Sequence, residues 1–226
     1  LALVQKLDLD VFGLQEVCPD QAQFLRENLV GYEFVGEHRN ADRTSGEASP
    51  VCYRKSRFEA LDKGTFWLSE TPEKPSMGWD AACYRTATWA LMKEKRTGKK
   101  FYFVNTHLDH VGKQARANGL ALIVDRIAEI NPEGYPMVLT GDFNVRPDNP
   151  CLVDLDKIMT STRKIAKKTD SKGTFNGWRK DREGGVIDYI YVSGFGEVVE
   201  YETITKKYAD RSFVSDHYPI MSVLKF

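Results

Sequence analysis

The chain has 226 residues, which is enough for one domain with a substantial hydrophobic core. Its 32 basic and 32 acidic residues cancel, which argues weakly against duplex nucleic acid as the main partner, because duplex-binding proteins usually carry a basic excess. No apolar run of about 20 residues predicts a transmembrane segment. The four cysteines are widely spaced and form no CxxC pair, so neither structural zinc nor a disulfide framework is indicated.

The chain opens with a helical pattern over residues 1–7 and without an initiator methionine. This start leaves the cellular compartment open. A secreted or periplasmic location would follow if a signal peptide had been removed, and a cytoplasmic one otherwise. The oligomeric state is also left open.

Apolar or alternating runs predict strands that pack in facing sheets. These runs are residues 11–15, 33–36, 49–53, 86–93, 100–106, 137–140, 186–192 and 218–224. Helices are predicted over residues 20–29, 114–130 and 150–159. Glycine, proline and serine gather at 40–50, 69–78 and 170–185, which predicts long surface loops. The pattern predicts a mixed α/β layered sandwich, with residues 1–226 forming a single domain.

Acidic, amide and histidine side chains gather at or near the ends of these predicted strands at five places. They are Glu16, His107 with Asp109 and His110, Asp142 with Asn144, Asp188 inside the run 186–192, and Asp216 with His217. Oxygen and imidazole ligands brought from several strand ends can hold a hard divalent cation and support hydrolysis of a phosphate ester. Glu16 alone would be interpreted as a salt-bridged or solvated strand end, but together with the other clusters it is interpreted as a metal ligand.

The spacing of Asp142 and Asn144 places both side chains on one side of an extended chain, while Phe143 points away into the packing. Asp142 could then prepare a water molecule, and Asn144 could hold a phosphoryl oxygen or the ion. The alternative is an Asx turn that caps the strand.

Three of the four histidines fall in these clusters, which argues against ordinary core histidines. Asp188 could orient His217 and favour its imidazolium form, which would stabilise pentavalent phosphorus, and Asp216 could ligate a metal. His107 and Asp109 would share one face if their strand continued beyond residue 106.

Arginines near the predicted site are candidates for substrate contacts. Arg116 lies near the start of the helix predicted over 114–130, where it could meet a substrate oxyanion, although a solvated surface arginine is nearly as plausible. Arg85, Arg39 and Glu47 are weaker candidates for the rim.

Motifs of three other nucleotide-binding or hydrolytic classes are absent: a P-loop, a dinucleotide-binding Gly-x-Gly-x-x-Gly and a Gly-x-Ser-x-Gly elbow. The aromatic residues Phe66, Trp67 and Trp178 could stack on a base or a sugar, but packing in the core or in loops is the commoner role of such side chains.

The ordered clusters resemble those of the endonuclease/exonuclease/phosphatase superfamily over essentially the whole chain. The matching motifs are Leu14-Gln15-Glu16, Asn105-Thr106-His107-Leu108, Gly141-Asp142-Phe143-Asn144, Asp188-Tyr189-Ile190 and Ser215-Asp216-His217-Tyr218-Pro219. The resemblance implies a four-layered α/β sandwich of two mainly antiparallel sheets flanked by helices. It also implies hydrolysis of phosphoesters with Mg²⁺ or Mn²⁺ as the cofactor.

The resemblance assigns expected roles to the residues that match its motifs. Glu16 is expected to be the principal metal ligand and Asp216 a further carboxylate of the metal site. The residues expected to act on the phosphate are Asp142, which would position the attacking water, Asn144 and His107, which would contact the phosphate, and His217 with Asp188, which would face the scissile bond.

Residues 46–50, 78–82 and 107–112 are similar to a bacterial branch of this superfamily. Deadenylase-like members place an arginine after the His-Leu motif, which favours a phosphate role for Arg116. Members of the superfamily begin with a strand that ends in a metal-binding asparagine. This chain starts in the helix that follows, so we expect that strand to be missing from the sequence given.

The leading expectation is a Mg²⁺- or Mn²⁺-dependent hydrolase in which an activated water attacks a phosphate mono- or diester in line. The expected substrate is a phosphorylated small molecule or a sugar or lipid phosphoester, with Arg116, Asp109 and Arg85 as substrate-binding residues. Two alternatives remain: a nuclease acting on DNA or RNA, which would show a basic stripe beside the site, and a non-catalytic binding module of the same fold.

Overall fold

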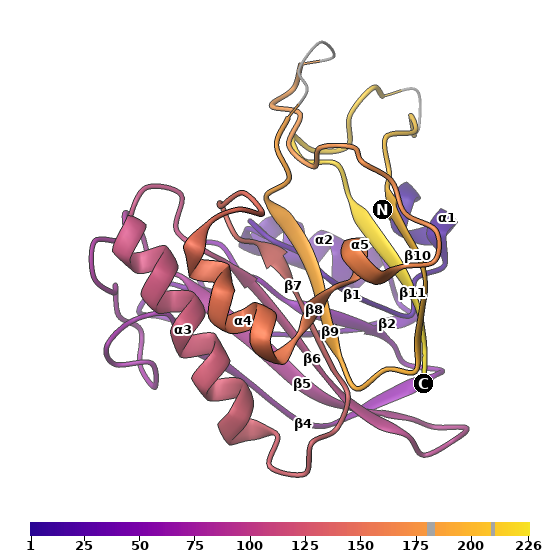
Figure 1. Cartoon of the computed structure of the whole chain (residues 1–226), viewed down its shortest axis with the longest axis horizontal. Coiled ribbons are helices and arrows are strands. Elements are labelled where there is room, and N and C mark those ends of the chain that lie inside the picture. The colour runs from indigo at the N-terminus through magenta and orange to yellow at the C-terminus, as the bar shows by residue number, and fades with distance from the viewer. Residues whose placement is uncertain (180–183, 209–210) are drawn as a thin grey trace.

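The computed structural model describes residues 1–179, 184–208 and 211–226 (Figure 1). Its helices are α1 (Ala2–Leu7), α2 (Pro19–Asn28), α3 (Lys113–Ile130), α4 (Val153–Ile158) and α5 (Thr162–Ile165), with a 3₁₀ helix η1 (Pro150–Leu152). Its strands are β1 (Val11–Gly13), β2 (Tyr32–Val35), β3 (Val51–Arg54), β4 (Phe58–Trp67), β5 (Thr86–Glu94), β6 (Lys100–His107), β7 (Met137–Asp142), β8 (Thr160–Ser161), β9 (Asp188–Ser193), β10 (Glu197–Thr203) and β11 (Ile220–Lys225). Among these described residues, none of the helices combines the length and apolar character needed to cross a membrane.

The largest sheet has the strand order β4-β5-β6-β7-β9-β8. All its neighbouring pairs are antiparallel except β6 and β7, which run parallel. Parallel strands need a crossover connection, and the long helix α3 lies between these two strands in the chain. In this register His107 pairs with Asp142, and Asp142 pairs with Asp188, so three strands place polar residues abreast at one end of the sheet.

Side chains alternate between the two faces of this sheet and form two separate cores. Leu139 and Tyr191 point to the face covered by α3 and α4, where they pack with Leu120 and Leu155. The next residues along the strands point the other way. That second core contains Phe103, Val138 and Ile190 of the large sheet, Val35 and Val51 of β2 and β3, and Val198 of β10.

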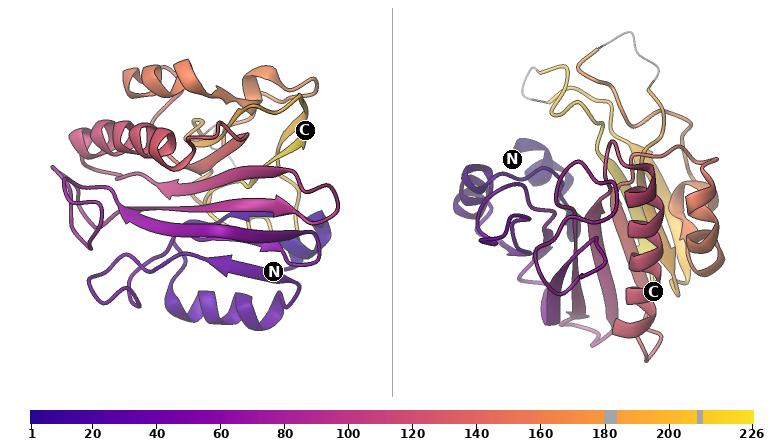
Figure 2. Two further views of the ribbon diagram at one scale, coloured as in Figure 1. Left: turned by 90° about the horizontal axis from the view of Figure 1, so that it is seen from below. Right: turned by 90° about the vertical axis from the view of Figure 1, so that its left-hand side faces the viewer.

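A second layer of strands faces the large sheet (Figure 2). It consists of the three-stranded sheet β1-β3-β2 and the two-stranded sheet β10-β11, both antiparallel. The outer face of β1-β3-β2 carries Phe12 and Cys52, which pack with Leu25 and Leu29 at helix α2. The layers therefore run helix, sheet, sheet, helix, which confirms the predicted four-layered α/β sandwich.

One buried amide joins the two sheets close to the polar end. Asn105 of β6 is fully buried; its Nδ2 donates to the carbonyl oxygens of Leu14 (2.7 Å) and Pro50 (3.1 Å). Its Oδ1 accepts from Gln15 Nε2 (2.7 Å) and from Thr140 Oγ1 (2.8 Å). These hydrogen bonds hold the end of β1 against the large sheet, and they thereby fix the position of the following residue, Glu16.

The structure differs from the sequence predictions mainly at sheet edges. Strands β4 and β10 were not predicted, because charged residues on their outward faces interrupt the apolar pattern, and each strand also contains a bulge. The predicted helix over 150–159 divides into η1 and the shorter α4. The strand predicted over 186–192 begins at Asp188, so this carboxylate lies at a strand end and not inside the strand.

Replacing Asn105 by alanine should lower the free energy of unfolding by about 3 kcal/mol, because two buried carbonyl groups, an amide and a hydroxyl would lose their partner. Urea unfolding followed by circular dichroism measures this change. Asn28→Ala is the matched control: Asn28 is exposed and donates one hydrogen bond to Phe24 O within α2 (2.8 Å), so we expect less than about 0.5 kcal/mol. Equal losses in the two variants would contradict the bridging role of Asn105.

Candidate active site

Polar residues from three strands and one loop meet at the end of the space between the two sheets. His107, Asp142 and Asp188 lie abreast on β6, β7 and β9, and all three are buried. His217 approaches from the segment before β11. One potential ligand atom each from Asp142, Asp188 and His217 lies within 4.8 Å of the others, so two carboxylates and an imidazole converge here.

His217 and Asp188 form a hydrogen-bonded pair. His217 Nδ1 lies 2.9 Å from Asp188 Oδ2 and 3.0 Å from Oδ1. Since a carboxylate only accepts, Nδ1 is the donor, and the other ring nitrogen, Nε2, faces Asp142 Oδ2 at 3.9 Å. The pair therefore presents Nε2 of a fixed imidazole ring toward a second carboxylate.

The surrounding carboxylates favour a charged imidazole. Burial opposes the imidazolium form, but the hydrogen bond with Asp188 and the negative charges of Asp188, Asp142 and Asp216 outweigh burial and raise the pKa of His217 from 6.5 to about 9. Burial, together with the charge of Asp142, raises the pKa of the Asp188 carboxyl, against the lowering effect of its hydrogen bond with His217.

Asp142 and Asn144 converge by a different route from the predicted one. The chain is not extended at Asn144, whose φ is 52°, and its backbone N–H donates to Asp142 Oδ1 (2.8 Å) in an Asx turn. Phe143 points away into the core, fully buried and stacked on Tyr189 with ring centroids 5.0 Å apart. Asn144 Nδ2 and Asp142 Oδ2 both reach His107 Nε2, at 3.2 and 3.3 Å.

Glu16 follows β1 in the left-handed conformation, with a φ of 58°, and its side chain is exposed. The argument that a carboxylate is buried at a strand end therefore does not apply to it. The next residue, Val17, pairs with Ala48 through two backbone hydrogen bonds (3.1 and 2.9 Å), which fixes the backbone beside Glu16. Within the described part of the chain, its carboxylate has no hydrogen bond or ion pair.

Asp216 is partly buried and accepts a hydrogen bond from Ser215 Oγ (3.3 Å). Neither Glu16 nor Asp216 belongs to a group of three potential ligand atoms within 4.8 Å of one another in residues 1–179, 184–208 and 211–226. Asp142 and Asp188 belong to such a group together with His217, and Asp109 belongs to another with Cys83 and His110.

The segment beside Asp188 contains supporting residues that the sequence analysis missed. Thr174 Oγ1 accepts from the backbone N–H groups of Ile187 (3.0 Å) and Asp188 (3.2 Å). The ring of Phe175 meets His217 edge-on, with centroids 5.0 Å apart. Thr174 is fully buried, although glycine-rich neighbours led to the prediction of a surface loop over 170–185. Residues 180–183 of that predicted loop lie outside the described residues.

Strand β6 ends at His107, so the extended backbone that would place His107 and Asp109 on one face does not continue to Asp109. Asp109 is buried and accepts hydrogen bonds from the backbone N–H groups of Val111 (2.9 Å) and Gly112 (2.7 Å), with Arg85 Nε 3.5 Å away. Burial opposes its ionisation, but these hydrogen bonds and the arginine charge hold the pKa of Asp109 below its ordinary value.

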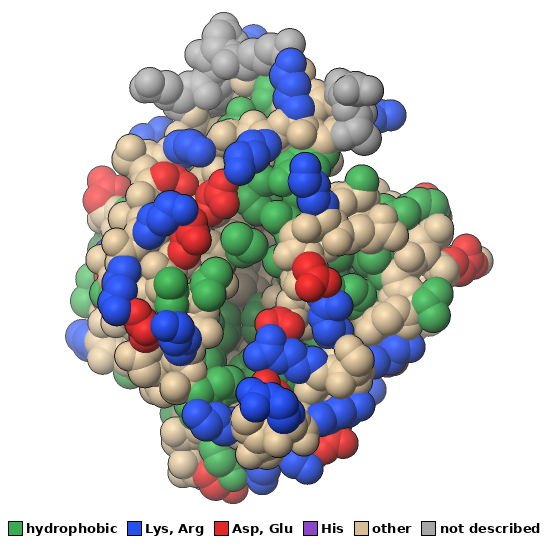
Figure 3. Space-filling view, turned by 90° about the vertical axis from the view of Figure 1, so that its right-hand side faces the viewer, with side chains coloured by type: hydrophobic (Ala, Val, Ile, Leu, Met, Phe, Trp, Pro, Cys, Tyr) green, Lys and Arg blue, Asp and Glu red, His purple; other side chains and the backbone are tan. Residues whose placement is uncertain are grey.

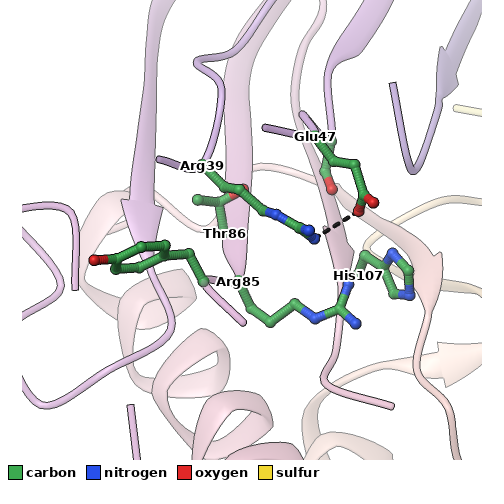
Figure 4. A pocket seen from close by; sticks show the side chains of 7 residues that line it. Arg39, Glu47, Arg85, Thr86 and His107 are labelled. Atoms are coloured by element: carbon green, nitrogen blue, oxygen red, sulfur yellow. Dashed lines mark hydrogen bonds and ion pairs between the residues drawn. The ribbon is translucent and has the colours of Figure 1, made fainter. Parts of the chain in front are cut away.

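Arg85 is buried beside the site and not at its rim. One of its terminal nitrogens lies 2.9 Å from His110 Nδ1. Its guanidinium extends toward His107 in a small pocket that is also lined by Arg39, Glu47, Ser49, Tyr84 and Thr86 (Figure 4). Arg39 and Glu47 form an ion pair across the pocket (2.6 Å). Arg116 donates to the carbonyl oxygen of Asp109 (3.0 Å), so it contacts the residue that is paired with Arg85.

The aromatic candidates have different surroundings. Phe66 and Trp67 are buried in or beside the core, and Trp67 Nε1 donates to Arg39 O (2.7 Å), so neither ring is available for stacking on a ligand. Trp178 is 62% exposed.

The profile of the Endonuclease/Exonuclease/phosphatase family matches residues 1–217. The chain belongs to this family. Its members are hydrolases that act on phosphoesters, which accounts for the convergence of carboxylates, an amide and imidazoles at one end of the sandwich.

Solved structures of other proteins agree with this assignment. The mannosyl-6-phosphatase of Bacteroides thetaiotaomicron is 35% identical, with a TM-score of 0.94, and the match covers 99% of this chain and 88% of that one. A family protein of Bacteroides vulgatus is 39% identical, with a TM-score of 0.92 and coverage of 99% and 87%. TDP2 of D. rerio, solved with a single-strand DNA product, is 20% identical with a TM-score of 0.77 and coverage of 96% and 86%, and shares the fold.

The elevated pKa of His217 can be measured by NMR on the protein in a metal chelator, where its ring should titrate near pH 9. In Asp188→Asn the loss of the carboxylate should lower that pKa toward 6.5.

The same pair predicts how stability depends on pH. Because the pKa of His217 is higher in the folded than in the unfolded state, the stabilisation of the fold by this pair is complete below about pH 6.5 and is lost as pH rises through about 9. The difference in stability between wild type and Asp188→Asn should shrink over that range. An unchanged pKa in the variant would refute the pairing.

Proposed function

We propose that this protein is a divalent-metal-dependent phosphoesterase that hydrolyses a phosphate monoester of a small sugar. The observation that carries the proposal is the convergence of Asp142, Asp188 and His217, with His107 and Asn144 in contact with Asp142. The similarity to a mannosyl-6-phosphatase at 35% identity supports a sugar phosphate as the substrate.

The donor set fits a hard cation. The acidic groups at this end of the molecule are oxygen ligands of the kind that Mg²⁺ and Mn²⁺ prefer, and the carboxylate of Glu16 is exposed and has no partner among the described residues. In the proposal Glu16 and Asp216 hold the cation, which would polarise a phosphoryl oxygen when bound. Without such a charge, the carboxylates would repel a phosphate dianion.

In the proposed reaction Asp142 orients the attacking water and takes up its proton. Its Oδ2 lies 3.3 Å from His107 Nε2 and 3.9 Å from His217 Nε2, so an imidazole nitrogen from each ring lies near the oxygen that would receive the proton. Asp188 keeps His217 charged, and the imidazolium would stabilise negative charge on the phosphoryl group as the P–O bond to the sugar breaks. The sugar oxygen leaves with the electron pair of that bond and takes up a proton from solvent, which gives the free sugar and phosphate. Asn144 and His107 would contact phosphoryl oxygens.

Arg85 is proposed to contact the substrate from the pocket beside His107. Asp109 and Arg116 are proposed to position it, because Asp109 lies against the guanidinium and Arg116 bonds the Asp109 carbonyl. The carboxylate of Asp109 also offsets the positive charge of Arg85. The Arg85 guanidinium would therefore offer a substrate fixed N–H donors, while the pair as a whole carries little net charge.

A nuclease is disfavoured by the overall charge, because the net charge of the sequence is zero. The one face shown in Figure 3 carries Lys and Arg side chains among Asp and Glu side chains. A polynucleotide would instead favour a basic stripe. The assay should therefore compare mannose 6-phosphate, a lipid phosphodiester and single-stranded DNA, with Mg²⁺ and with Mn²⁺, and preferential hydrolysis of DNA would contradict the proposal.

Asp142→Asn should lower kcat for mannose 6-phosphate by about a thousandfold, because the amide cannot accept the proton of the attacking water. Steady-state kinetics measure the loss, and circular dichroism confirms the fold. Asp125→Asn is the matched control, since Asp125 is an exposed residue of α3, and its activity should equal that of wild type. Activity of Asp142→Asn within tenfold of wild type would exclude the proposed role.

Removal of divalent metal with EDTA should abolish hydrolysis, and Mg²⁺ or Mn²⁺ should restore it.

Glu16→Gln should raise the metal concentration for half-maximal activity about tenfold or more, because a charged ligand becomes neutral. Calorimetric titration of the metal should show the same shift. Glu27→Gln, on the exposed side of α2, should match wild type. Full activity in EDTA would contradict metal dependence, and absence of metal binding would favour a binding module.

A further inference from the structure

Trp178 combines two features that folding does not explain. Its side chain is 62% exposed, whereas the other three tryptophans, which all lie within the described residues, are buried or partly buried. Its backbone φ is 62°, in the left-handed region that bulky side chains rarely adopt. Trp79 shares a positive φ (51°), but its side chain is partly buried. An exposed ring on a strained backbone contributes little to the stability of the core. These two features are therefore better explained by a role of Trp178 in binding than by one in folding.

The backbone around Trp178 is anchored to the proposed active site. Asn176 is fully buried; its Oδ1 accepts from the Trp178 backbone N–H (2.9 Å), and its Nδ2 donates to Ser215 O (3.1 Å). The backbone N–H groups of Asn176 and Gly177 both donate to Asp216 O (2.8 and 2.9 Å). The loop that holds the indole is therefore fixed to the segment that carries Asp216 and His217.

Aromatic contacts brace the indole on its other side. Phe213 meets Trp178 nearly at right angles (85°), with ring centroids 6.5 Å apart. Phe213 in turn contacts Tyr218, the residue after His217, with centroids 6.0 Å apart. The segments that carry these rings rise together beyond the strand end where β9 begins (Figure 1). This is the end at which Asp188 lies, so the exposed indole and the proposed phosphate site share one end of the molecule.

We propose that Trp178, braced by Phe213, is a stacking platform for the ring of a hexose whose phosphate is bound in the proposed active site, beside Asp142, Asp188 and His217. This inference rests on the proposed function and names the part of the site that would recognise the sugar. The C–H groups on one face of a pyranose can pack on the electron-rich face of an indole. Zero net charge offers no long-range attraction for a polynucleotide, and a solved neighbour at 35% identity is a mannosyl-6-phosphatase, so a sugar is favoured over a base.

The kinetic test compares a substrate with a ring and one without. Trp178→Ala should raise KM for mannose 6-phosphate about tenfold, the effect typical of a lost aromatic stacking contact, while KM for glycerol 3-phosphate changes less than about twofold. Trp178→Phe should retain most of the affinity, because it keeps an aromatic face. Phe24→Ala is the matched control: Phe24 is 50% exposed on α2, and both KM values should equal those of wild type.

Three outcomes would overturn the proposal. Equal losses on the two substrates would show that Trp178 only holds the loop, and no loss on either would show that it has no role in binding. A larger loss for a nucleoside 5′-monophosphate than for mannose 6-phosphate would assign the platform to a base. Trp178→Asn separates folding from binding, since asparagine tolerates a positive φ: its melting temperature should not fall, and a clear fall would indicate a structural role.

Failure of the proposed function can be distinguished from failure of the platform. If no phosphoester is hydrolysed, mannose 6-phosphate is titrated into the wild-type protein and into Trp178→Phe while tryptophan fluorescence is recorded. A saturable change in wild type that is absent from the variant supports the platform without any reaction. Identical titrations of the two proteins overturn it.

Discussion

The two sheets of this sandwich are held in register near the proposed site by the side chain of Asn105. An amide can donate and accept at once, so this one group satisfies the Leu14 and Pro50 carbonyls, Gln15 and Thr140 in a place that water does not reach. Gly13 is part of the same contact, because a Cβ at this position would lie 2.2 Å from Asn105 Oδ1. The position of the exposed Glu16 thus depends on a buried contact of the preceding residue.

The side chains of β6 and β7 that face the second layer of strands change from apolar to polar toward one end of the large sheet. The proposed site lies at that polar end. Phe103 belongs to the core between the sheets, Asn105 joins the sheets, and His107 contacts Asp142. Because the side-chain period of a strand is two residues, these positions share one face without any irregularity in the chain. Asp188 joins these positions through its register with Asp142. A site built on three paired strands is more rigid than one built on loops, which suits a reaction that depends on fixed geometry.

The sequence predicted the layers of the fold and the clusters that meet, because periodicity and strand-end polarity depend on local patterns. The prediction of extended backbone at Asn144 was wrong, because the backbone there forms the alternative Asx turn with Asp142. The supporting role of Thr174 was missed because its neighbours are polar and rich in glycine, and its burial arises in the folded structure, where its hydroxyl accepts from the Asp188 backbone. The shared face of His107 and Asp109 was conditional on a strand that continued beyond residue 106; β6 ends at His107, and the exact end of a strand is the part of an element that a sequence pattern locates least well.

The order of the site residues along the chain has a consequence for biosynthesis. His107 and Asp142 precede Asp188 and His217 in the chain, and His217 follows Asp142 by 75 residues. A chain emerging from the ribosome can form the β5-β6-β7 sheet with α3 well before the acidic pair Asp142 and Asp188 gains its imidazole. Until β11 docks on β10, two like charges face each other at the end of the sheet without the compensating cation of His217. Docking of β11 and electrostatic relief of the site are therefore coupled, and a chain cut short before residue 217 would have neither.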